Sequence, residues 1–248
     1  MRSFLLALQF LTIIPVKIRH LNEQKLSESI IYFPIVGLLL GLILLLANKL
    51  LFFLNFESFF INIILVILLL ILTGGLHLDG LADTFDAFLS RKDKDEKLKI
   101  MRDSHIGVMG VLSLICIILL KIAFLSSINM SVKTIALLLM CTLSRWTLVL
   151  SMILFPYARQ EGKAKVFIQG INLKIFFLAT IITLCSVALV WQLKGLLVFL
   201  TTAISAYIMG KFIKRKIDGI TGDTLGAINE LIEIFVLFSI CIIERSGL

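Results

Sequence analysis

The sequence predicts an all-α fold: a polytopic bundle of about seven transmembrane helices, with a short interfacial or re-entrant helix at the N-terminus. Of the 248 residues, 59% are hydrophobic and only 16% are charged, and the mean hydropathy is +1.06. A soluble domain cannot bury this much apolar surface, so the excess must face lipid. A bilayer without water requires the backbone to pair internally, and only three prolines interrupt the chain, so its apolar runs are expected to be helical.

Seven apolar stretches are candidate membrane spans by length. Residues 3–16 are too short to span comfortably and are expected to form the interfacial helix, stopped by Pro15. Gly195 is expected to mark the turn before the sixth stretch. With no internal repeat and no low-complexity linker, residues 1–248 are expected to form a single membrane-embedded domain. The seven stretches are 31–54, 58–78, 107–127, 133–155, 174–193, 195–210 and 228–244.

The basic residues predict the orientation of the chain. Alternate loops hold 17 of the 24 lysines and arginines, whereas the intervening loops hold almost none. Loops rich in these residues stay on the cytoplasmic side of a membrane. The same charge suits either anionic lipid or a phosphorylated substrate, and both interpretations stay open. The basic loops are 17–30, 79–106, 156–174 and 211–227.

The stretch GGLHLDGLADTFDAF, residues 74–88, places three carboxylates after an uncharged apolar run. Asp79, Asp83 and Asp86 stand at i, i+4 and i+7, so a helix would present them on one face. Carboxylates this close raise one another's pKa unless a cation compensates, and their oxygens suit Mg²⁺, Mn²⁺ or Ca²⁺. A solvated cap without a cation fits less well, because apolar residues surround them. His77 is either a ligand or a packed histidine, and the flanking glycines predict a bend or a close backbone approach.

A second motif, IMRDSHIGVMG, opens the next membrane helix at residues 100–110. Asp103 and Ser104 are of the types that cap helix N-termini, which is the simplest interpretation. The functional interpretation adds Arg102 and His105 as donors to a phosphate at the positive end of that helix.

A third motif, DGITGDTLGAINELIE at residues 218–233, is rich in glycine and threonine and leads into a helix. Its segment TGDTLGA could cradle a phosphate, although it is not a Walker A sequence. Glu230 and Glu233 lie one turn apart in an apolar helix. Carboxylates are costly there and are functional candidates, unless they lie shallow, within reach of water.

Further cationic side chains complete the polar set. Arg145 lies inside an apolar run and is expected to pair with a buried acid or a substrate phosphate. Lys121, nearer a helix end, is expected to extend to the surface. Arg159 and Tyr157 belong to a predicted cytoplasmic loop. All the polar motifs thus meet at one membrane face, and together they suit a divalent cation that holds a phosphate or pyrophosphate.

These motifs resemble those of the cobalamin synthase family, the adenosylcobinamide-GDP ribazoletransferases. GLHLDGLADTFD followed by the RDSxIG and TGDTLGA blocks is specific, and matching blocks run through nearly the whole chain. In one departure, Ile13 and Ile14 stand where an arginine often precedes the proline, so that arginine has no counterpart here. The matching blocks are QFLTIIPV (9–16), FPIVGLLLG (33–41), GGLHLDGLADTFDAF (74–88), IMRDSHIGVMGV (100–111), SRW (144–146), YARQEGKA (157–164) and ITGDTLGAINELIE (220–233).

The resemblance implies a multi-pass inner-membrane enzyme of the last stage of vitamin B12 assembly, with its active site facing the cytoplasm. Such an enzyme joins adenosylcobinamide-GDP to α-ribazole, or to its 5′-phosphate, and releases GMP with the support of Mg²⁺. The bilayer is then the surrounding partner, nucleic acid is not expected, and a homo-oligomer stays an open alternative.

Carried onto this chain, the resemblance predicts residue roles as a hypothesis. Mg²⁺ would neutralise the pyrophosphate and stabilise the charge that develops on the leaving phosphate. The expected catalytic residues are Asp86, as the preferred base, with Asp83, Arg102 and His105. The expected metal ligands are Asp79, Asp83, Asp86, Asp103, Asp223 and Glu230, and the expected substrate-binding residues are His77, Arg145, Arg159, Thr221, Gly222 and Thr224.

Two other functions stay open. CDP-alcohol phosphotransferases also use aspartates on membrane helices, but their motif has an arginine after the Asp-Gly…Ala element, where this chain has Asp83. A cation transporter would place its acidic residues near the midplane, often in repeats, whereas here they lie at predicted helix ends.

Overall fold

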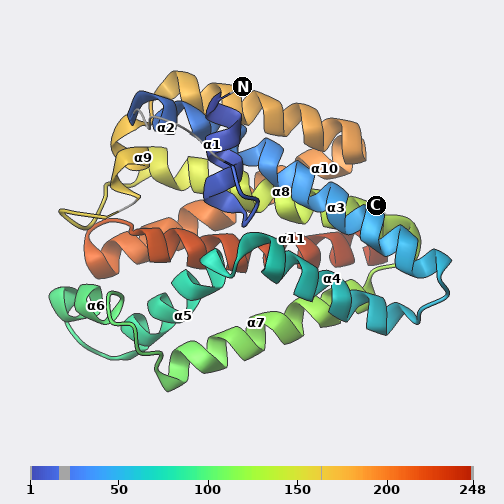
Figure 1. Ribbon diagram of the computed structural model, residues 1–248, viewed down its shortest axis with the longest axis horizontal. Helices are drawn as coiled ribbons and strands as arrows, with labels where there is room; N and C mark the ends of the chain where they lie inside the picture. The colour runs from blue at the N-terminus through green and yellow to red at the C-terminus, as the bar shows by residue number, and fades with distance from the viewer. Residues whose placement is uncertain (1, 17–22, 163, 247–248) are drawn as a thin grey trace.

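The computed structural model describes residues 2–16, 23–162 and 164–246, which form a bundle of long helices with short helices gathered at one end (Figure 1). Lys17, Arg19 and Lys163, counted above in the basic loops, lie outside the described residues. The helices are α1 (Arg2–Leu11), α2 (Glu23–Ser29), the 3-10 turn η1 (Ile30–Tyr32), α3 (Phe33–Phe53), α4 (Ser58–Thr73), α5 (Leu76–Leu89), α6 (Lys94–Ile100), α7 (Val108–Ser127), α8 (Met130–Leu154), α9 (Lys165–Gly170), α10 (Leu173–Ile217) and α11 (Gly222–Ser246).

The centre of the bundle is formed by α8 and α11. In their most apolar stretches 78% and 72% of the residues are buried, against 28% for α7 and 22% for α10. Within the described ranges, five helices are long and apolar enough to cross a membrane, and α4 with α5 makes a sixth if the bent pair is one span. These observations confirm the predicted all-α membrane bundle.

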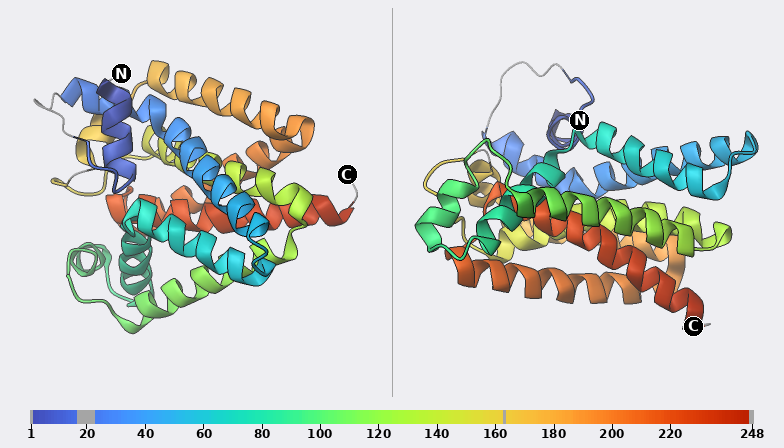
Figure 2. Two further views of the ribbon diagram at one scale, coloured as in Figure 1. Left: turned by 45° about the vertical axis from the view of Figure 1, so that its right-hand side comes forward. Right: turned by 90° about the horizontal axis from the view of Figure 1, so that it is seen from below.

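The long helix α10 is two helices joined at a sharp turn. Trp191 and Gln192 leave helical geometry, with Gln192 at a φ of 45°, and the second arm runs back beside the first (Figures 1 and 2). The predicted stretches 174–193 and 195–210 therefore form two separate helical arms, and that each arm crosses the membrane stays a prediction. The turn lies before Gly195, which serves another purpose: a Cβ there would stand 2.7 Å from the carbonyl oxygen of Val187. Glycine thus lets the two arms pack closely.

A second sharp bend separates α4 from α5. Gly74 and Gly75 both adopt left-handed conformations, with φ of 60° and 69°, which glycine reaches without steric cost. The two helix axes differ by 91°. The predicted continuous span 58–78 was wrong in this respect, because the chain turns after Thr73. The predicted bend at the glycines is confirmed.

The described parts of the four basic loops lie at one end of the bundle. This is the end where α2, α6 and α9 gather, whereas the turns after α3 and α7 lie at the other end (Figures 1 and 2). The short N-terminal helix α1 also lies nearer the first end. It stops at Leu11, so the predicted stop at Pro15 was wrong by four residues. Beyond it, the Ile13 N–H donates to the Leu72 carbonyl at 2.9 Å.

Four charged side chains form a network inside the bundle, where α7, α8 and α11 meet. Lys121 Nζ lies 2.6 Å from Glu230 Oε2 and 2.5 Å from Glu233 Oε2, and Arg145 pairs with the other oxygen of Glu233. The Asn229 amide also donates to Glu233, at 3.2 Å. Two cations facing two carboxylates leave no net charge, which allows these groups to lie in an apolar interior.

The positions of these four side chains test what the sequence predicted for them. Arg145 does pair with a buried acid, as predicted. Lys121 is only 1% exposed, so its expected extension to the surface was wrong. Glu230 and Glu233 are 4% and 0% exposed, so neither lies shallow, within reach of water.

Replacing Glu233 with Gln leaves Lys121 and Arg145 facing one carboxylate instead of two. Removing one partner of a buried ion pair costs about 3–5 kcal/mol. We therefore expect a clear fall in the thermal unfolding midpoint of the detergent-solubilised protein. Glu57→Gln, at an exposed position before α4, is the matched control and should leave the midpoint near that of the wild type. An unchanged midpoint for Glu233→Gln would show that the network does not stabilise the bundle.

Candidate active site

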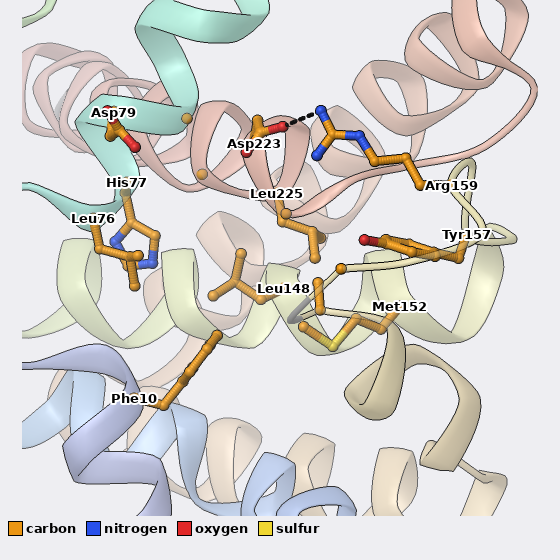
Figure 3. A pocket seen from close by; sticks show the side chains of 15 residues that line it. Phe10, Leu76, His77, Asp79, Leu148, Met152, Tyr157, Arg159, Asp223 and Leu225 are labelled. Carbon is orange, nitrogen blue, oxygen red and sulfur yellow. Dashed lines mark ion pairs between the residues drawn. The ribbon is translucent and has the colours of Figure 1, made fainter. Parts of the chain in front are cut away.

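A cavity of about 310 Å³ lies between α5, α8, α11 and the 157–164 segment. Its polar side chains come from α5 (His77 and Asp79), from the 157–164 segment (Tyr157 and Arg159) and from the start of α11 (Asp223) (Figure 3). Its apolar lining includes Phe10, Leu148, Met152 and Leu225. Segments far apart in the sequence therefore bring cationic, acidic and aromatic groups around one space.

The close crossing of α5 and α11 places the aspartates of the two helices together. A Cβ on Gly80 would stand 2.6 Å from the carbonyl oxygen of Asp223, and a Cβ on Gly226 would stand 2.9 Å from that of His77. Neither contact leaves room for a side chain. The two glycines thus let the helix carrying Asp79 lie directly against the first turn of α11, which confirms the predicted close backbone approach.

The Arg159 side chain is fixed over Asp223. Its NH2 nitrogen lies 2.7 Å from Asp223 Oδ2, and only 11% of the side chain is exposed. The backbone around it is tied to the residues before α11, because the Ala158 N–H donates to the Ile220 carbonyl and the Ile220 N–H to the Pro156 carbonyl, each at 2.9 Å. Arg159, a predicted substrate-binding residue, is therefore held at the cavity.

The segment TGDTLGA begins α11, and its two threonines form hydrogen bonds that cap the N-terminus of this helix. The Thr221 N–H donates to Thr224 Oγ1 at 2.8 Å, and the Thr224 N–H donates to Thr221 Oγ1 at 3.2 Å. This reciprocal arrangement satisfies backbone donors that the first turn of a helix leaves free. Both threonines are fully buried, so the expectation that their hydroxyls cradle a phosphate is not supported. Gly222, also predicted to bind substrate, does line the cavity.

Asp79 lines the cavity, whereas Asp83 of the same helix is not among its lining residues. Among the described residues neither carboxylate has a hydrogen-bond or ion-pair partner. Asp83 lies one turn beyond Asp79 on α5, outside the five long membrane helices. Partial burial, with the nearby carboxylates Asp79 and Asp223, raises the pKa of Asp83 to about 7. The mutual repulsion predicted for this acidic face is therefore present, and a cation would relieve it.

Asp86, the third aspartate, is engaged elsewhere. Its Oδ2 accepts the Gly107 N–H at 2.7 Å and its Oδ1 accepts the Gly110 N–H at 2.8 Å. A carboxylate at a helix N-terminus satisfies orphan donors and favours the helix dipole. The cap of α7 therefore comes from α5, and the predicted capping by Asp103 or Ser104 was wrong. Asp86 has no oxygen free of these bonds, so its predicted roles as base and metal ligand are not supported by the geometry.

The RDSH segment lies in the exposed loop before α7. His105 Nδ1 stands 2.6 Å from Asp103 Oδ1, and the two side chains are 89% and 56% exposed. This contact lowers the pKa of Asp103. Neither residue lines the cavity. Arg102 is also exposed and does not line the cavity. Burial raises the pKa of Tyr157, although the nearby Arg159 opposes this shift.

Two predicted site residues lie in the buried network and not at the cavity. Glu230 is paired with Lys121 and Arg145 with Glu233, so the structure gathers neither with the aspartates of α5. His77 does line the cavity, where its buried Nδ1 has no hydrogen-bond partner within the described part of the chain. It remains a predicted substrate-binding residue.

The carboxylates at the cavity suit a magnesium ion that keeps some of its waters. They do not form a site in which protein ligands alone enclose a metal. Within the described ranges, no three His, Cys, Asp or Glu side chains converge into a ready-made metal site. Mg²⁺, however, usually keeps several waters and binds one or two carboxylates together with substrate phosphates. Asp79 of α5 and Asp223 of α11 both line the cavity, so carboxylates from two helices are available there for a cation of this kind.

Sequence reasoning missed the apolar part of the cavity. Phe10 stacks near Phe167, with ring centroids 4.5 Å apart, and Leu148 and Met152 face the cavity from α8. One signal was available for Phe10, which lies in QFLTIIPV (9–16), one of the blocks that resemble the family. Leu148 and Met152 lie in a uniformly apolar run that gives no such signal.

Comparison with known proteins identifies relatives along the whole chain. Residues 3–241 match the family described as cobalamin-5-phosphate synthase. An adenosylcobinamide-GDP ribazoletransferase of Caldanaerobacter subterraneus subsp. tengcongensis is 39% identical over 245 residues, covering 97% of this chain and 98% of the relative. Enzymes of the same name from Fusobacterium nucleatum and Clostridioides difficile are 36% and 34% identical, with 98% and 97% of both chains covered. No solved structure matches this chain.

The Asp86 contacts predict a structural effect at the start of α7. Asp86→Ala removes both acceptors, so we expect faster hydrogen exchange at Gly107 and Gly110 and a loss of about 1–3 kcal/mol of stability. Asp86→Asn keeps one acceptor oxygen, so its hydrogen-exchange rates and its stability should lie between those of the wild type and of Asp86→Ala. Asp95→Ala, at an exposed position in α6, is the control and should change neither quantity. Unchanged exchange at both glycines in Asp86→Ala would contradict the capping role.

Proposed function

The chain belongs to the cobalamin-5-phosphate synthase family, and on that premise we propose that it joins adenosylcobinamide-GDP to α-ribazole or its 5′-phosphate and releases GMP. The observation that carries this proposal is the cavity, which is lined by the ion pair of Arg159 with Asp223 and by the carboxylate of Asp79. A pyrophosphate needs a guanidinium donor and a cation at one place, and this arrangement offers both. It favours phosphotransfer over transport of a cation.

The reaction is a displacement at phosphorus. A ribose hydroxyl oxygen of ribazole attacks the phosphorus that carries the cobinamide, and a new P–O bond forms there. The P–O bond to the phosphate of GMP breaks, and GMP leaves with the bonding electrons. Because such transfers depend on positioning and on charge stabilisation, the main task of the residues is to hold the pyrophosphate in line with the hydroxyl.

Arg159 binds the non-bridging phosphate oxygens in this proposal. Its side chain lines the cavity, and one terminal nitrogen is paired with Asp223, so the remaining N–H groups of the guanidinium are proposed to donate to the substrate. His77 offers its unpaired ring nitrogen from α5.

Mg²⁺ would be held by Asp79 and Asp223 and would supply charge neutralisation of the pyrophosphate. Asp83 replaces Asp86 as the proposed acceptor of the hydroxyl proton, since both oxygens of Asp86 hold the start of α7. The cavity lies toward the end of the bundle that holds the basic loops. By the positive-inside rule we place this end in the cytoplasm, with the chain in the inner membrane.

Replacing Asp83 with Asn removes the proposed proton acceptor. General base catalysis contributes about 10²–10⁴-fold to rate, so we expect GMP release from adenosylcobinamide-GDP and α-ribazole to fall by at least about 100-fold. The variant should still be recovered in the membrane fraction. Omission of Mg²⁺ should abolish the reaction of the wild type.

The control for this experiment is Asp95→Asn, which changes the same residue type in the exposed helix α6. It should keep wild-type turnover. If Asp83→Asn keeps its turnover, the proton-transfer role is wrong. If the wild type releases no GMP with either form of ribazole, the proposed function itself is wrong.

A further inference from the structure

A groove of about 510 Å³ lies between the end of α8 and the last turns of α10. The buried ring of Phe155, which follows α8, stacks with Tyr207 of α10, with ring centroids 6.2 Å apart. Glycine permits this packing, because a Cβ on Gly210 would collide with the Phe155 ring. Leu154 adds an aliphatic wall. This space, which we call the α10 groove, shares no lining residue with the cavity of the candidate active site.

Three cationic side chains line the α10 groove without being neutralised by the protein. Lys211, Lys214 and Arg215 are exposed, and in the part of the chain that the structure describes none of them has an ion-pair partner. Asp218 also lines the groove, but its carboxylate is already paired with Lys94, at 2.8 Å. The described lining therefore carries three positive charges in excess.

The helix dipole of α10 accounts for only part of this charge. A cation is stabilised by the dipole within about the last turn of a helix. Lys214 and Arg215 belong to the last turn, as does Lys216, which lies over the Phe212 ring and does not line the groove. Lys211 lies one turn earlier, so the dipole does not explain it. The rule for basic loops explains an excess of charge at this end of the bundle, but not its position around a groove.

The same face of α10 is apolar farther from the end of the helix. Leu200, Ile204 and Tyr207 are 56%, 52% and 47% exposed. They precede Lys211 and Lys214 on one face, because the five residues follow one another every three or four positions. This second arm of α10 runs to the end of the bundle where α6 lies (Figure 2). One stripe of its surface thus passes from aliphatic side chains, through a tyrosine of the kind found at membrane interfaces, to cations.

We propose that the α10 groove binds the headgroup of an anionic phospholipid, with the acyl chains along Leu200 and Ile204. Two ammonium groups and a guanidinium donate charge-assisted hydrogen bonds to phosphate oxygens. The exposed aliphatic stripe favours a lipid over a soluble phosphate, because it continues from the cations to where acyl chains would lie. A zwitterionic headgroup would bring its own ammonium against three cations, so a headgroup with a net negative charge fits better.

The α10 groove adjoins the two segments that hold Arg159. Phe155 is followed directly by Pro156, and Asp218 lies two residues before Ile220, whose N–H donates to the Pro156 carbonyl at 2.9 Å. A bound headgroup would therefore contact the ends of α8 and α10 together. A ligand that binds only the folded state stabilises it, so occupancy of the groove should raise the resistance of the bundle to unfolding.

The test is a lipid titration of the full-length protein in a neutral maltoside detergent. Dioleoylphosphatidylglycerol and dioleoylphosphatidylcholine are added separately, bound lipid is counted by native mass spectrometry, and the thermal unfolding midpoint is recorded. One variant, Lys211→Gln/Lys214→Gln/Arg215→Gln, removes the three cations. The other, Leu154→Trp, fills the groove and keeps every charge.

Each variant has a matched control. Arg91→Gln/Lys92→Gln/Lys99→Gln removes the same charge at exposed positions around α6, at the same end of the bundle. Leu119→Trp introduces the same ring at a position of α7 that is 60% exposed.

We expect the wild type to bind one phosphatidylglycerol at least about tenfold more tightly than phosphatidylcholine. Each basic residue near an anionic headgroup contributes about a fivefold factor. The triple groove variant should therefore bind phosphatidylglycerol at least about tenfold more weakly, and Leu154→Trp should weaken it by a similar factor. Both controls should stay within about twofold of the wild type. Phosphatidylglycerol should raise the unfolding midpoint of the wild type and of the controls, but not that of the groove variants.

Three results would overturn the inference. An equal loss of binding in the control triple variant would show that total charge binds the lipid, and not the groove. Unchanged binding in Leu154→Trp would show that the space is not occupied, and this variant decides the question if the triple groove variant does not fold. Soluble glycerol 3-phosphate is the last arm: if it raises the midpoint as much as phosphatidylglycerol does, the groove binds soluble phosphates and the lipid assignment is wrong. None of these measurements requires GMP release, so the outcome is independent of the proposed function.

Discussion

The need to neutralise charge in an interior without water organises this bundle. Glu233 of α11 receives Lys121 from α7 and Arg145 from α8, so one carboxylate joins the three helices that surround the core. The desolvation cost of each ion is offset only when all of them are present and well placed. The mutual orientation of these helices is thereby restricted, and α11 is fixed as the element against which α5 must pack.

The chain holds two kinds of charged residue. Inside the bundle, the cationic and acidic side chains are equal in number and pair with one another. At the crossing of α5 and α11 the charges are not matched: Asp79 and Asp83 have no partner among the described residues, and Arg159 has an unsatisfied Nε. Imbalance of this kind is what a ligand with phosphates and a cation would complete, whereas the interior group already holds equal numbers of cations and carboxylates.

The sequence predicted the class of fold well because lipid imposes long apolar runs, and each run could be recognised without knowing its neighbours. It also placed Asp79, Arg159 and Asp223 in the site. It did less well where a residue's role depends on a partner distant in the chain. Asp86 looked equivalent to Asp79 on helical spacing, but the start of α7 lies against it. Lys121 and Glu230 looked independent, and their pairing follows from how α7 and α11 cross. The bends at Gly74 and at Gln192 were easier, because glycines mark the first and the polar residues of WQLK, 191–194, interrupt the apolar run at the second.

The capping of α7 by Asp86 also bears on the chain between them. Since Asp86 is bonded to Gly107 and Gly110, the excursion that contains α6 begins and ends at points fixed to each other. Its closure does not depend on the path that the intervening residues take. The free-energy cost of closing a flexible loop, which is entropic, grows by only about 0.6 kcal/mol for each doubling of loop length. Asp86 therefore keeps the end of α5 and the start of α7 together, whatever conformation the residues between them adopt.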